Sequence, residues 1–537
     1  MLDRVRKSLM PLAHRRRFQV LLVGEGCLVG IVGGGIVTLY RIALARAEGL
    51  MRGILTACGH TPVFVLLWFA ALAAIMLVVG KLVELVPNTG GSGIPQTEAE
   101  VMGRLNMHWH RIIPTKFVEG VLCTMAGLSL GREGPSVQLG GMSGKAVSRV
   151  LKRGRGEERL LVTCGAAAGM SAAFHAPLTG VLFAIEEIHH AFTAPLIISV
   201  MASSVVADFF VSQVLGMTPT LNYIFMSTLP HIDYALVVLL GIVMGVLGSL
   251  HNAGMFASQG LSKRLGNGYA RLAVPFALAG AAAFLAPDLL CGGDAIAELI
   301  VNKYGETSLA VLASILVGKY VLTAICFGSG APGGTLFPLV IMGACAGALY
   351  GGIVIGALDM PVAYITNFTL FGIAGLFSAV VRAPVTGIVL VFELSGSFEV
   401  LTSVSIVSII AFVTANLIGT KPFYEKMLGD LLEGQGQTGS EGGLPGEKVL
   451  EWFTVGMGSA CEGHRIRTID WPRGVLVVSV TRAGVELMPE ANLRLMALDE
   501  ITVMVNADCE ASAMPILVQL TDPDPATELV PGGDDDS

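Results

Sequence analysis

Long apolar stretches, broken by short segments rich in glycine, proline or charge, run from about residue 18 to residue 432 of this 537-residue chain. A helix needs about 20 residues to cross a hydrocarbon core of about 30 Å, so the pattern predicts roughly a dozen or more helices, some too short to span a membrane. The clearest candidates are residues 18–40, 62–86, 160–185, 196–215, 234–250, 272–284, 309–327, 336–355 and 401–418.

Three motifs interrupt these apolar stretches: GSGIP at residues 91–95, GREGP at 131–135 and GSGAPGG at 328–334. Glycine and proline end helices, and a helix that stops inside a membrane leaves its first N–H groups without partners. Lipid cannot satisfy those donors, so such breaks persist only where they line a polar cavity. Because helix N-termini also carry partial positive charge, three of them predict an anion site at mid-depth.

An internal repeat relates the two halves of the apolar region. APLTG at residues 176–180 recurs 207 positions later as APVTG at 383–387, and Glu186 falls on Glu393 with the same offset. Broken helices at matching places in two halves of a membrane protein point to a transporter-type binding site.

Composition agrees with a membrane protein, since the chain is 53% hydrophobic and 14% charged, with a mean hydropathy of +0.70. From Glu433 to the end, 6 Lys and Arg face 18 Asp and Glu, net −12, so residues 1–432 carry 28 minus 23, or +5. The basic residues of segments 1–17 and 152–159 place both in the cytoplasm by the positive-inside rule. The nine cysteines form no CxxC pair, which predicts reduced thiols and neither disulfides nor a metal site.

Beyond residue 432 the pattern is that of a soluble domain. Residues 475–480 and 501–505 alternate in strand fashion, and turn signals occur at 483–484 and 489–492. The predicted division is a basic cytoplasmic N-terminus at 1–17, a membrane transport domain at 18–432 with repeats at about 18–225 and 226–432, a linker at 433–446, an α+β domain at 447–520 and an acidic disordered tail at 521–537.

Together with GAAAGMSAAFHAPLTGVLFAIEE at 165–187 and KPFY at 421–424, the three motifs resemble those of the CLC chloride channels and chloride/proton antiporters. The resemblance covers about residues 18–432, with all motifs in family order. It implies a homodimer in the lipid bilayer, with an anion path in each subunit between two inverted repeats. The predicted fold class is therefore an all-α polytopic membrane protein with a CLC-type inverted repeat and broken helices, plus a small α+β C-terminal cytosolic domain.

The resemblance also implies a chloride site. The family's central chloride contact matches Ser92, whose hydroxyl can donate to an anion without charge; the alternative is a serine bonded to its own turn. Tyr424 matches the family tyrosine that caps the inner side of the ion, whereas alone it would be an ordinary interfacial tyrosine. The other predicted chloride-binding residues are Gly134, Thr335, Leu336 and Phe337.

Glu133 is the predicted gate. A carboxylate among helix N-terminal donors is a tethered anion that competes with chloride, and protonation lets it swing away. Intramembrane acids are functional by default because burying them is costly. Arg132 and Lys116 are predicted to give electrostatic support. Their alternatives are a structural Arg132–Glu133 salt bridge and a lysine that snorkels to the interface.

Glu186 and Glu187 point about 100° apart on a helix, so they do different work. Glu186 has the repeat partner Glu393 and is interpreted as structural. Glu187 falls on Leu394, and the second glutamate of the family pair relays protons from the cytoplasm in many exchangers. Its presence therefore favours exchange over a channel.

Histidine patterns suggest weaker alternatives. Glu187 and His190 have the Glu-x-x-His spacing of di-iron bundles, but the repeat supplies no second copy. His189 and His190 are predicted near the aqueous end of their helix, and His108-Trp109-His110 in a loop. We expect no metal and no cofactor, with chloride as the bound ion.

One departure from the family follows GSGAPGG. Leu336 occupies the usual phenylalanine position, and Phe337 comes one residue later. The backbone donors remain, so anion binding is expected to persist while the outer constriction changes shape. Ser92 and the intact GREGP resemble the chloride branch of the family.

Residues 478–505 resemble a TrkA-C (RCK C-terminal) domain, with Leu498-Asp499 where that family usually has Gly-Asp. Such domains commonly dimerise and bind small ligands, sometimes nucleotides. The domain is therefore predicted to be regulatory, with a small-molecule or nucleotide ligand; the alternative is a dimer brace without one.

The favoured interpretation is a secondary active chloride/proton antiporter, not an enzyme and without a nucleic-acid partner. It is expected in the plasma membrane (the inner membrane of a bacterium), with both termini cytoplasmic. The alternatives are a passive voltage- or pH-gated chloride channel of the same fold, and a membrane receptor whose broken helices are vestigial.

Overall fold

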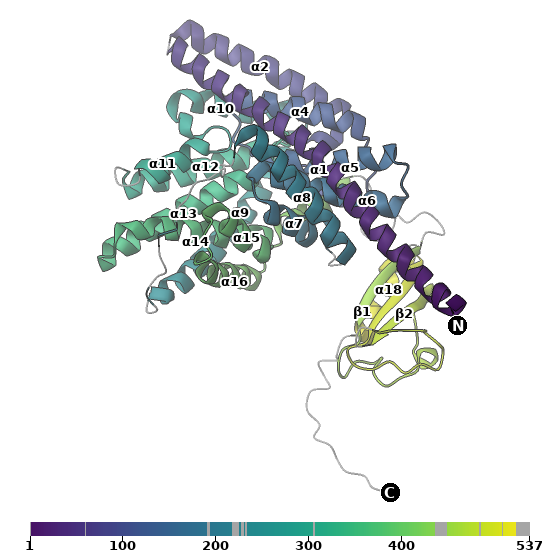
Figure 1. Ribbon diagram of the computed structural model, residues 1–537. Helices are drawn as coiled ribbons and strands as arrows, with labels where there is room; N and C mark the ends of the chain where they lie inside the picture. The colour runs from purple at the N-terminus through teal and green to yellow at the C-terminus, as the bar shows by residue number, and fades with distance from the viewer. Residues whose placement is uncertain are drawn as a thin grey trace. The chain divides into compact units, whose positions relative to one another are not determined.

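The structure is a computed structural model that describes residues 2–59, 61–190, 194–216, 225–226, 230, 233–303, 307–434, 448–482, 485–506 and 509–521. The chain divides into two compact units, Met1–Leu428 and Gly429–Ser537 (Figure 1). Within the described residues, 9 helices are long and apolar enough to cross a membrane.

Two sets of helices follow one another in the same order in the first unit. The first set is α1 (Leu2–Cys58), α2 (Pro62–Leu85), α3 (Ile94–Val101), α4 (Trp109–Met125), α5 (Glu133–Val150), α6 (Arg155–Phe174), α7 (Pro177–Phe183) and α8 (Ala194–Leu215). The second set is α9 (Tyr234–Lys263), α10 (Gly268–Leu285), α11 (Asp294–Lys303), α12 (Leu309–Gly328), α13 (Leu336–Leu358), α14 (Ile365–Val381), α15 (Pro384–Ser395) and α16 (Val400–Ile418), after which comes α17 (Phe423–Gly434). Each helix of the first set thus has a counterpart in the second, as the predicted two-repeat fold requires.

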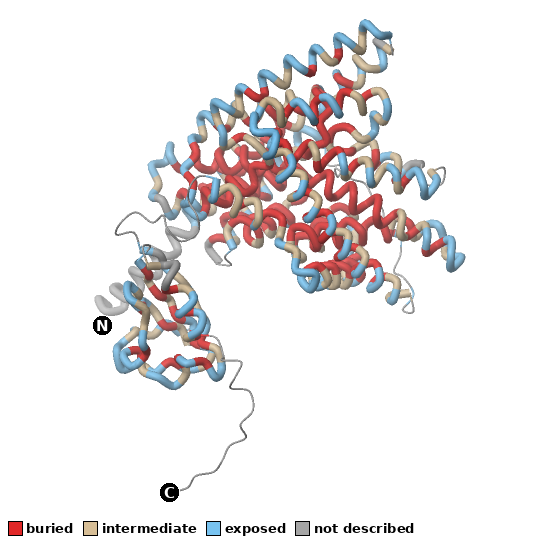
Figure 2. The backbone as a smooth tube through the Cα atoms, turned by 180° about the vertical axis from the view of Figure 1, so that it is seen from behind, coloured by how far each residue is buried: buried red, intermediate tan, exposed pale blue. Residues whose placement is uncertain are grey.

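The helix interfaces follow the same repeat. Helix α5 packs on α6 as α13 packs on α14, and these four contribute much of the buried interior (Figure 2). Small residues allow the close approach: a Cβ atom on Gly140 would collide with the backbone of Gly165, and one on Gly343 would lie 2.9 Å from the Gly372 oxygen. Without a hydrophobic force between helices in lipid, such close packing is what holds them together.

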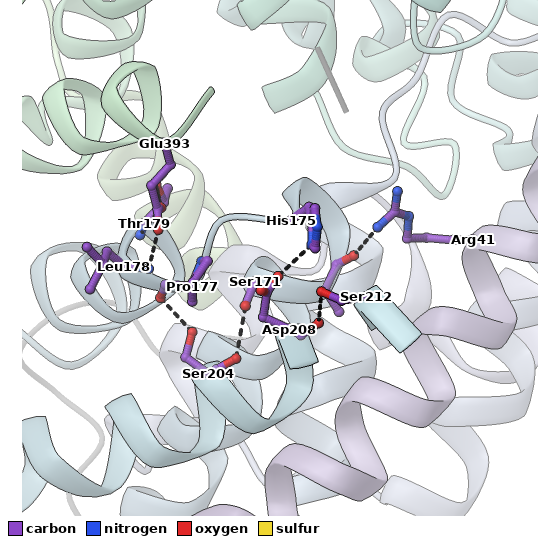
Figure 3. A network of polar contacts seen from close by, with 11 residues as sticks. Arg41, Ser171, His175, Pro177, Leu178, Thr179, Ser204, Asp208, Ser212 and Glu393 are labelled. Atoms are coloured by element: carbon purple, nitrogen blue, oxygen red, sulfur yellow. Dashed lines mark hydrogen bonds and ion pairs between the residues drawn. The ribbon is translucent and has the colours of Figure 1, made fainter. Parts of the chain in front are cut away.

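The sequence prediction of one helix over residues 160–185 is wrong, because the chain breaks at its centre. Helix α6 ends at Phe174, His175 has φ +61°, and α7 begins at Pro177, whose missing N–H suits a first turn. A polar network surrounds the break (Figure 3): Ser204 Oγ donates to the Pro177 oxygen at 2.6 Å, and His175 Nδ1 lies 2.7 Å from Asp208 Oδ1. The freed backbone groups are therefore satisfied inside the protein.

One other local prediction is wrong, and one feature of the helices was not predicted. Trp109 and His110 begin α4, with His108 as its N-cap, so the predicted loop is the start of a helix. Beyond α7, the chain continues as a π-helix over Ala184–His189, which carries Glu186 and Glu187. Such single-turn π segments occur frequently at functional sites.

The second unit contains an antiparallel sheet with strand order β1-β4-β2-β3, and α18 packs against it. Its elements are β1 (Lys448–Thr454), β2 (Val475–Arg482), β3 (Val485–Leu487), β4 (Glu500–Asn506) and α18 (Glu510–Thr521). Strands β2 and β4 confirm the predicted strands at 475–480 and 501–505, and the alternating positions Ile501, Val503 and Val505 of β4 are buried. The predicted turn at 483–484 lies outside the described residues.

Thr521 belongs to the folded domain and not to the tail in which the sequence placed it. It ends α18, it is 2% exposed, and its oxygen accepts a hydrogen bond from Gly456 N at 2.8 Å. The predicted tail beyond it, 522–537, and most of the predicted linker, 435–446, lie outside the described residues.

Candidate anion-binding site

Backbone hydrogen bonds join the three glycine motifs into one cluster. Gly91 N donates to the Gly330 oxygen at 3.0 Å, and Gly333 N donates to the Gly91 oxygen at 3.0 Å. Gly131 and Gly334 exchange a pair of bonds, of 2.6 and 2.8 Å. Segments more than 200 residues apart in the sequence therefore meet where each apolar stretch is broken.

Three helices begin at this cluster: α3 at Ile94, α5 at Glu133 and α13 at Leu336. The start of α5 lies against Ser92, since a Cβ atom on Gly134 would be 2.5 Å from the Ser92 oxygen Oγ. Helix starts of this kind present unpaired N–H groups and partial positive charge. The cluster is therefore suited to an anion.

Three hydroxyl side chains lie at the same point. Ser92 is 2% exposed, and its Oγ has no hydrogen-bond partner of ordinary geometry within the described chain. Tyr424, in the first turn of α17, is 1% exposed, and its hydroxyl interacts with Ser92 and Thr335. A buried donor without a fixed partner is costly, so the Ser92 hydroxyl is available to a ligand.

Glu133 is buried within this cluster, at 0% exposure. Its two carboxylate oxygens have no hydrogen-bond partner of ordinary geometry in the described chain, although the N–H groups of Glu133 itself and Phe337 face them. Oε2 lies 2.6 Å from the place that a Cβ atom on Gly131 would take. Because Gly131 has no Cβ atom, the Glu133 carboxylate has room beside the hydrogen-bonded glycine motifs.

Arg132 contacts Glu133 only loosely. Its Nε lies 3.7 Å from Glu133 Oε1, which is too long for a hydrogen bond. The guanidinium also stands 5.2 Å from the ring centre of Phe337 and 4.0 Å from Asp294 Oδ1. Arg132 therefore forms an ion pair with Glu133 without a hydrogen bond and shares its charge with Asp294 and the Phe337 ring, so the alternative of a structural salt bridge stays open.

Lys116 is fully buried, and the interpretation of a snorkelling lysine is wrong. Its Nζ donates to the carbonyl oxygens of Thr89 and Gly91, at 2.7 Å each. Glu119 lies near, and its Oε1 accepts from Thr89 Oγ1 at 2.9 Å. The lysine thus fixes the turn that carries Ser92 and places a positive charge behind it.

The residues that depart from the family pattern are both buried. Leu336 is 0% exposed and Phe337 is 1% exposed. The Phe337 ring lies between Arg132 and Phe174, whose ring centre is 6.3 Å away. Phe337 therefore forms part of the wall on the Arg132 side of the cluster.

Glu187 lies on the π-helix and is 8% exposed. It is close enough to interact electrostatically with Tyr424, Glu98, Glu186 and Glu425. Sequence reasoning missed Glu98 of α3, which is 3% exposed and whose Oε1 lies 3.0 Å from His190 Nε2. The sequence did offer one signal for Glu98: it is an acidic residue only four positions after Ile94, at which the helix begins within GSGIP.

The two histidines of this region have separate partners. His189 Nδ1 lies 2.9 Å from Thr163 Oγ1, whereas the half-exposed His190 contacts Glu98. Within the described residues, no group of three His, Cys, Asp or Glu side chains could hold a metal ion.

Two family descriptions match this chain. Residues 75–416 match the family "Voltage gated chloride channel", and residues 450–517 match the "TrkA-C domain". An H(+)/Cl(-) exchange transporter ClcA of Yersinia pestis bv. Antiqua (strain Angola) is 32% identical over 449 residues, which cover 80% of this chain and 92% of that protein.

Solved structures are similar over the same region. A slow cyanobacterial Cl-/H+ antiporter superposes with a TM-score of 0.73 and 26% identity, covering 77% of this chain and 99% of that one. A eukaryotic CLC transporter gives a TM-score of 0.64 at 20% identity, covering 76% and 74%, which concerns the fold alone.

Proposed function

The chain belongs to the voltage-gated chloride channel (CLC) family, and we propose that it works as a secondary active chloride/proton antiporter. The observation that carries this proposal is the position of Tyr424. Its hydroxyl interacts with Ser92 and Thr335, and it lies within electrostatic reach of both Glu133 and Glu187. A neutral hydroxyl site flanked by two buried acids suits a path on which an anion and a proton share one region.

Glu133 supplies the exchange step. Ionised, its carboxylate is itself an anion at the start of α5, where the helix dipole and open N–H groups favour negative charge. Chloride seeks the same donors, so the two compete. Protonation removes the charge of Glu133 and lets chloride take its place, which makes proton uptake and anion entry alternatives at one position.

Ser92, Thr335 and Tyr424 hold the chloride ion once it has entered the site. Hydroxyl groups donate hydrogen bonds without a full positive charge, so the ion is stabilised but can still leave. Gly134, Leu336 and Phe337 contribute their backbone N–H groups to the chloride site. The positive charges of Lys116 and Arg132 lower the free-energy cost of placing an anion there. Glu187 passes the proton between Glu133 and the cytoplasmic side.

The Yersinia pestis relative is named an H(+)/Cl(-) exchange transporter, which supports antiport over a passive channel. We place the protein in the plasma membrane as a homodimer with both termini in the cytoplasm.

The TrkA-C domain binds a small ligand, such as a nucleotide, and regulates transport. This role would be contradicted if none of a panel of nucleotides raised the thermal midpoint of the purified domain.

Reconstitution into liposomes tests the main proposal. An imposed chloride gradient should drive protons uphill, and a proton gradient should drive chloride. Chloride flux without proton movement would instead show that the protein is a channel. If neither chloride nor protons moved, the protein would be neither an antiporter nor a channel. A proton ionophore, which should abolish the pH change but not the chloride flux, is the control.

A further inference from the structure

The start of α11 repeats the start of α3, residue by residue, at an offset of 200. A short 3₁₀ turn, Pro87–Thr89, precedes α3, and Pro287–Leu289 precedes α11. Gly93 has φ +99° and Gly293 has φ +114°, so both segments have a positive φ just before the helix, which glycine adopts readily. The helices then begin at Ile94 and at Asp294. The second copy therefore carries an acid where the first has an apolar residue.

A buried lysine supports each turn in the same way. Lys116 donates to the oxygens of Thr89 and Gly91, and Lys319 donates to the oxygens of Leu289 and Cys291, at 3.0 and 2.7 Å. Both lysines are 0% exposed. The second repeat thus builds the same rigid turn as the one that presents Ser92, and this turn presents Asp294.

Asp294 meets the gate region through Arg132. Arg132 Nη2 lies 4.0 Å from Asp294 Oδ1, and Arg132 Nε lies 3.7 Å from Glu133 Oε1. The Phe337 ring holds the guanidinium from one side and packs against the turn before α11, since a Cβ atom on Gly292 would lie 2.8 Å from Phe337 Cδ1. One guanidinium is therefore shared between the buried carboxylate of Glu133 and the carboxylate of Asp294.

A small cavity is lined by Arg132 and Asp294. Its volume is about 30 Å³, and its wall includes Gly131, Arg132, Asp294, Phe337 and Glu48. This is room for about one or two water molecules. The Glu133 carboxylate adjoins the wall at Gly131, whereas the Asp294 side chain is 44% exposed. Water in the cavity can therefore connect a buried acid with one that solvent reaches.

We propose that Asp294 is a positioning and proton-relay residue for Glu133, acting through Arg132 and the water of this cavity. A proton taken from solvent by the Asp294 carboxylate passes to cavity water and then to the Glu133 carboxylate, and Asp294 is left ionised. When ionised, Asp294 draws Arg132 away from Glu133 and adds a negative charge nearby. Both effects favour the protonated form of Glu133, in which chloride can enter. This inference rests on the proposed antiport.

Other charges near Asp294 must be considered in the test. The groups that face it from neighbouring elements are Arg132 and Glu133 of α5, Arg41 and Glu48 of α1, Lys319 of α12 and Cys291 of the preceding turn. Glu298 lies one turn further along α11. Glu48 lines the same cavity and pairs with Arg52 at 3.0 Å, so it belongs to the proposed relay region, whereas the exposed Glu298 offers a matched acid on the same helix as Asp294.

The test compares Asp294→Asn, Asp294→Glu and Glu298→Gln with the unchanged protein in liposomes, at equal pH on both sides. The measured quantity is the rate of chloride-driven proton transport as a function of that pH. For Asp294→Asn we expect a lower rate at neutral pH and a profile displaced to lower pH by about half a unit. The chloride-to-proton ratio should stay unchanged. Asp294→Glu should restore the profile, and Glu298→Gln should coincide with the unchanged protein.

Two results would overturn the relay: an Asp294→Asn profile that coincides with the unchanged protein, or an equal displacement in Glu298→Gln. If the amide variant does not purify as a monodisperse protein, Asp294→Ser keeps a polar residue at the helix start and repeats the comparison. Absence of proton transport in the unchanged protein would contradict the proposed antiport and, with it, this inference. Normal coupling with an unmoved Asp294→Asn profile would contradict the inference alone.

Discussion

Glu186 and Glu393 each bond to the first turn of a helix that belongs to the other repeat. Glu393 accepts hydrogen bonds from Thr179 N and Oγ1 of α7, at 2.8 and 2.6 Å (Figure 3). Glu186 accepts from Thr386 N and Oγ1 of α15, at 2.9 and 2.7 Å. The two halves thus satisfy each other's helix starts by the same contact made twice, which locks the repeats together.

This exchange predicts different effects for two adjacent glutamates. Glu186→Gln should lower the stability of the purified protein by about 1–2 kcal/mol, because the charged cap of α15 is lost. Glu187 caps no helix start among the residues that the structure describes, so Glu187→Gln should leave the thermal midpoint nearly unchanged and reduce proton transport while chloride flux continues. Melting curves in detergent and liposome flux on both variants check this. An unstable Glu187→Gln with normal coupling would reverse the two assignments.

Ser92→Ala should weaken chloride binding about 2- to 10-fold, the usual value of one hydrogen bond. The hydroxyl is buried and interacts with the Tyr424 hydroxyl of the same site, so its loss should affect the ligand more than the fold. Isothermal titration with chloride measures the change. Ser143→Ala is the control, because Ser143 is also buried but donates to the Leu139 oxygen within α5 at 2.7 Å. Equal weakening in both variants would place the ion elsewhere.

Leu498→Gly should stabilise the C-terminal domain by about 1 kcal/mol. Leu498 has φ +66°, a conformation that costs a residue with a Cβ about 1–2 kcal/mol, and its side chain is 72% exposed. Little packing is therefore lost on its removal. Denaturant unfolding of residues 448–521 measures the gain, and Leu498→Ala, which keeps the Cβ, should show none. A destabilised glycine variant would mean that the exposed leucine packs against something else.

The same domain should lose stability in acid through Asp499. Burial acts in the opposite direction, but the hydrogen bonds from Arg482, at 2.8 Å each, and from Met496 N hold the pKa of Asp499 below its usual value. A lowered pKa in the folded state contributes stability above the unfolded pKa of about 3.9, and this contribution disappears as pH falls through the folded pKa. The unfolding free energy should therefore decline below about pH 4. In Asp499→Asn that part of the decline should be absent; an unchanged pH profile would contradict the assignment.

The sequence was sufficient to predict the convergence of the three motifs, because glycine and proline mark helix ends and lipid does not tolerate open ones. The sequence analysis did not predict the π-helix that carries Glu186 and Glu187, because it treated these residues as part of one regular helix. The start of α11 was also missed. It repeats the turn of GSGIP but has no proline after its glycines, and its equivalence rests on the lysine contacts and backbone angles.

The single-helix prediction over 160–185 failed for a related reason. Its composition is mostly apolar on both sides of the break, so hydrophobicity alone does not reveal it. The break is satisfied by tertiary bonds, from Ser204 to Pro177 and from Glu393 to Thr179, which come from distant segments. Pro177 was the one local signal, and a proline can also lie within a membrane helix.

Proton coupling in Glu133→Gln tests the central claim most directly. Glutamine keeps nearly the shape of the side chain but cannot carry the charge or the proton. The account predicts that chloride moves through this variant in liposomes while a chloride gradient no longer pumps protons. Chloride-driven proton transport that persists in Glu133→Gln would show that the carboxylate and the anion do not exchange places in this site.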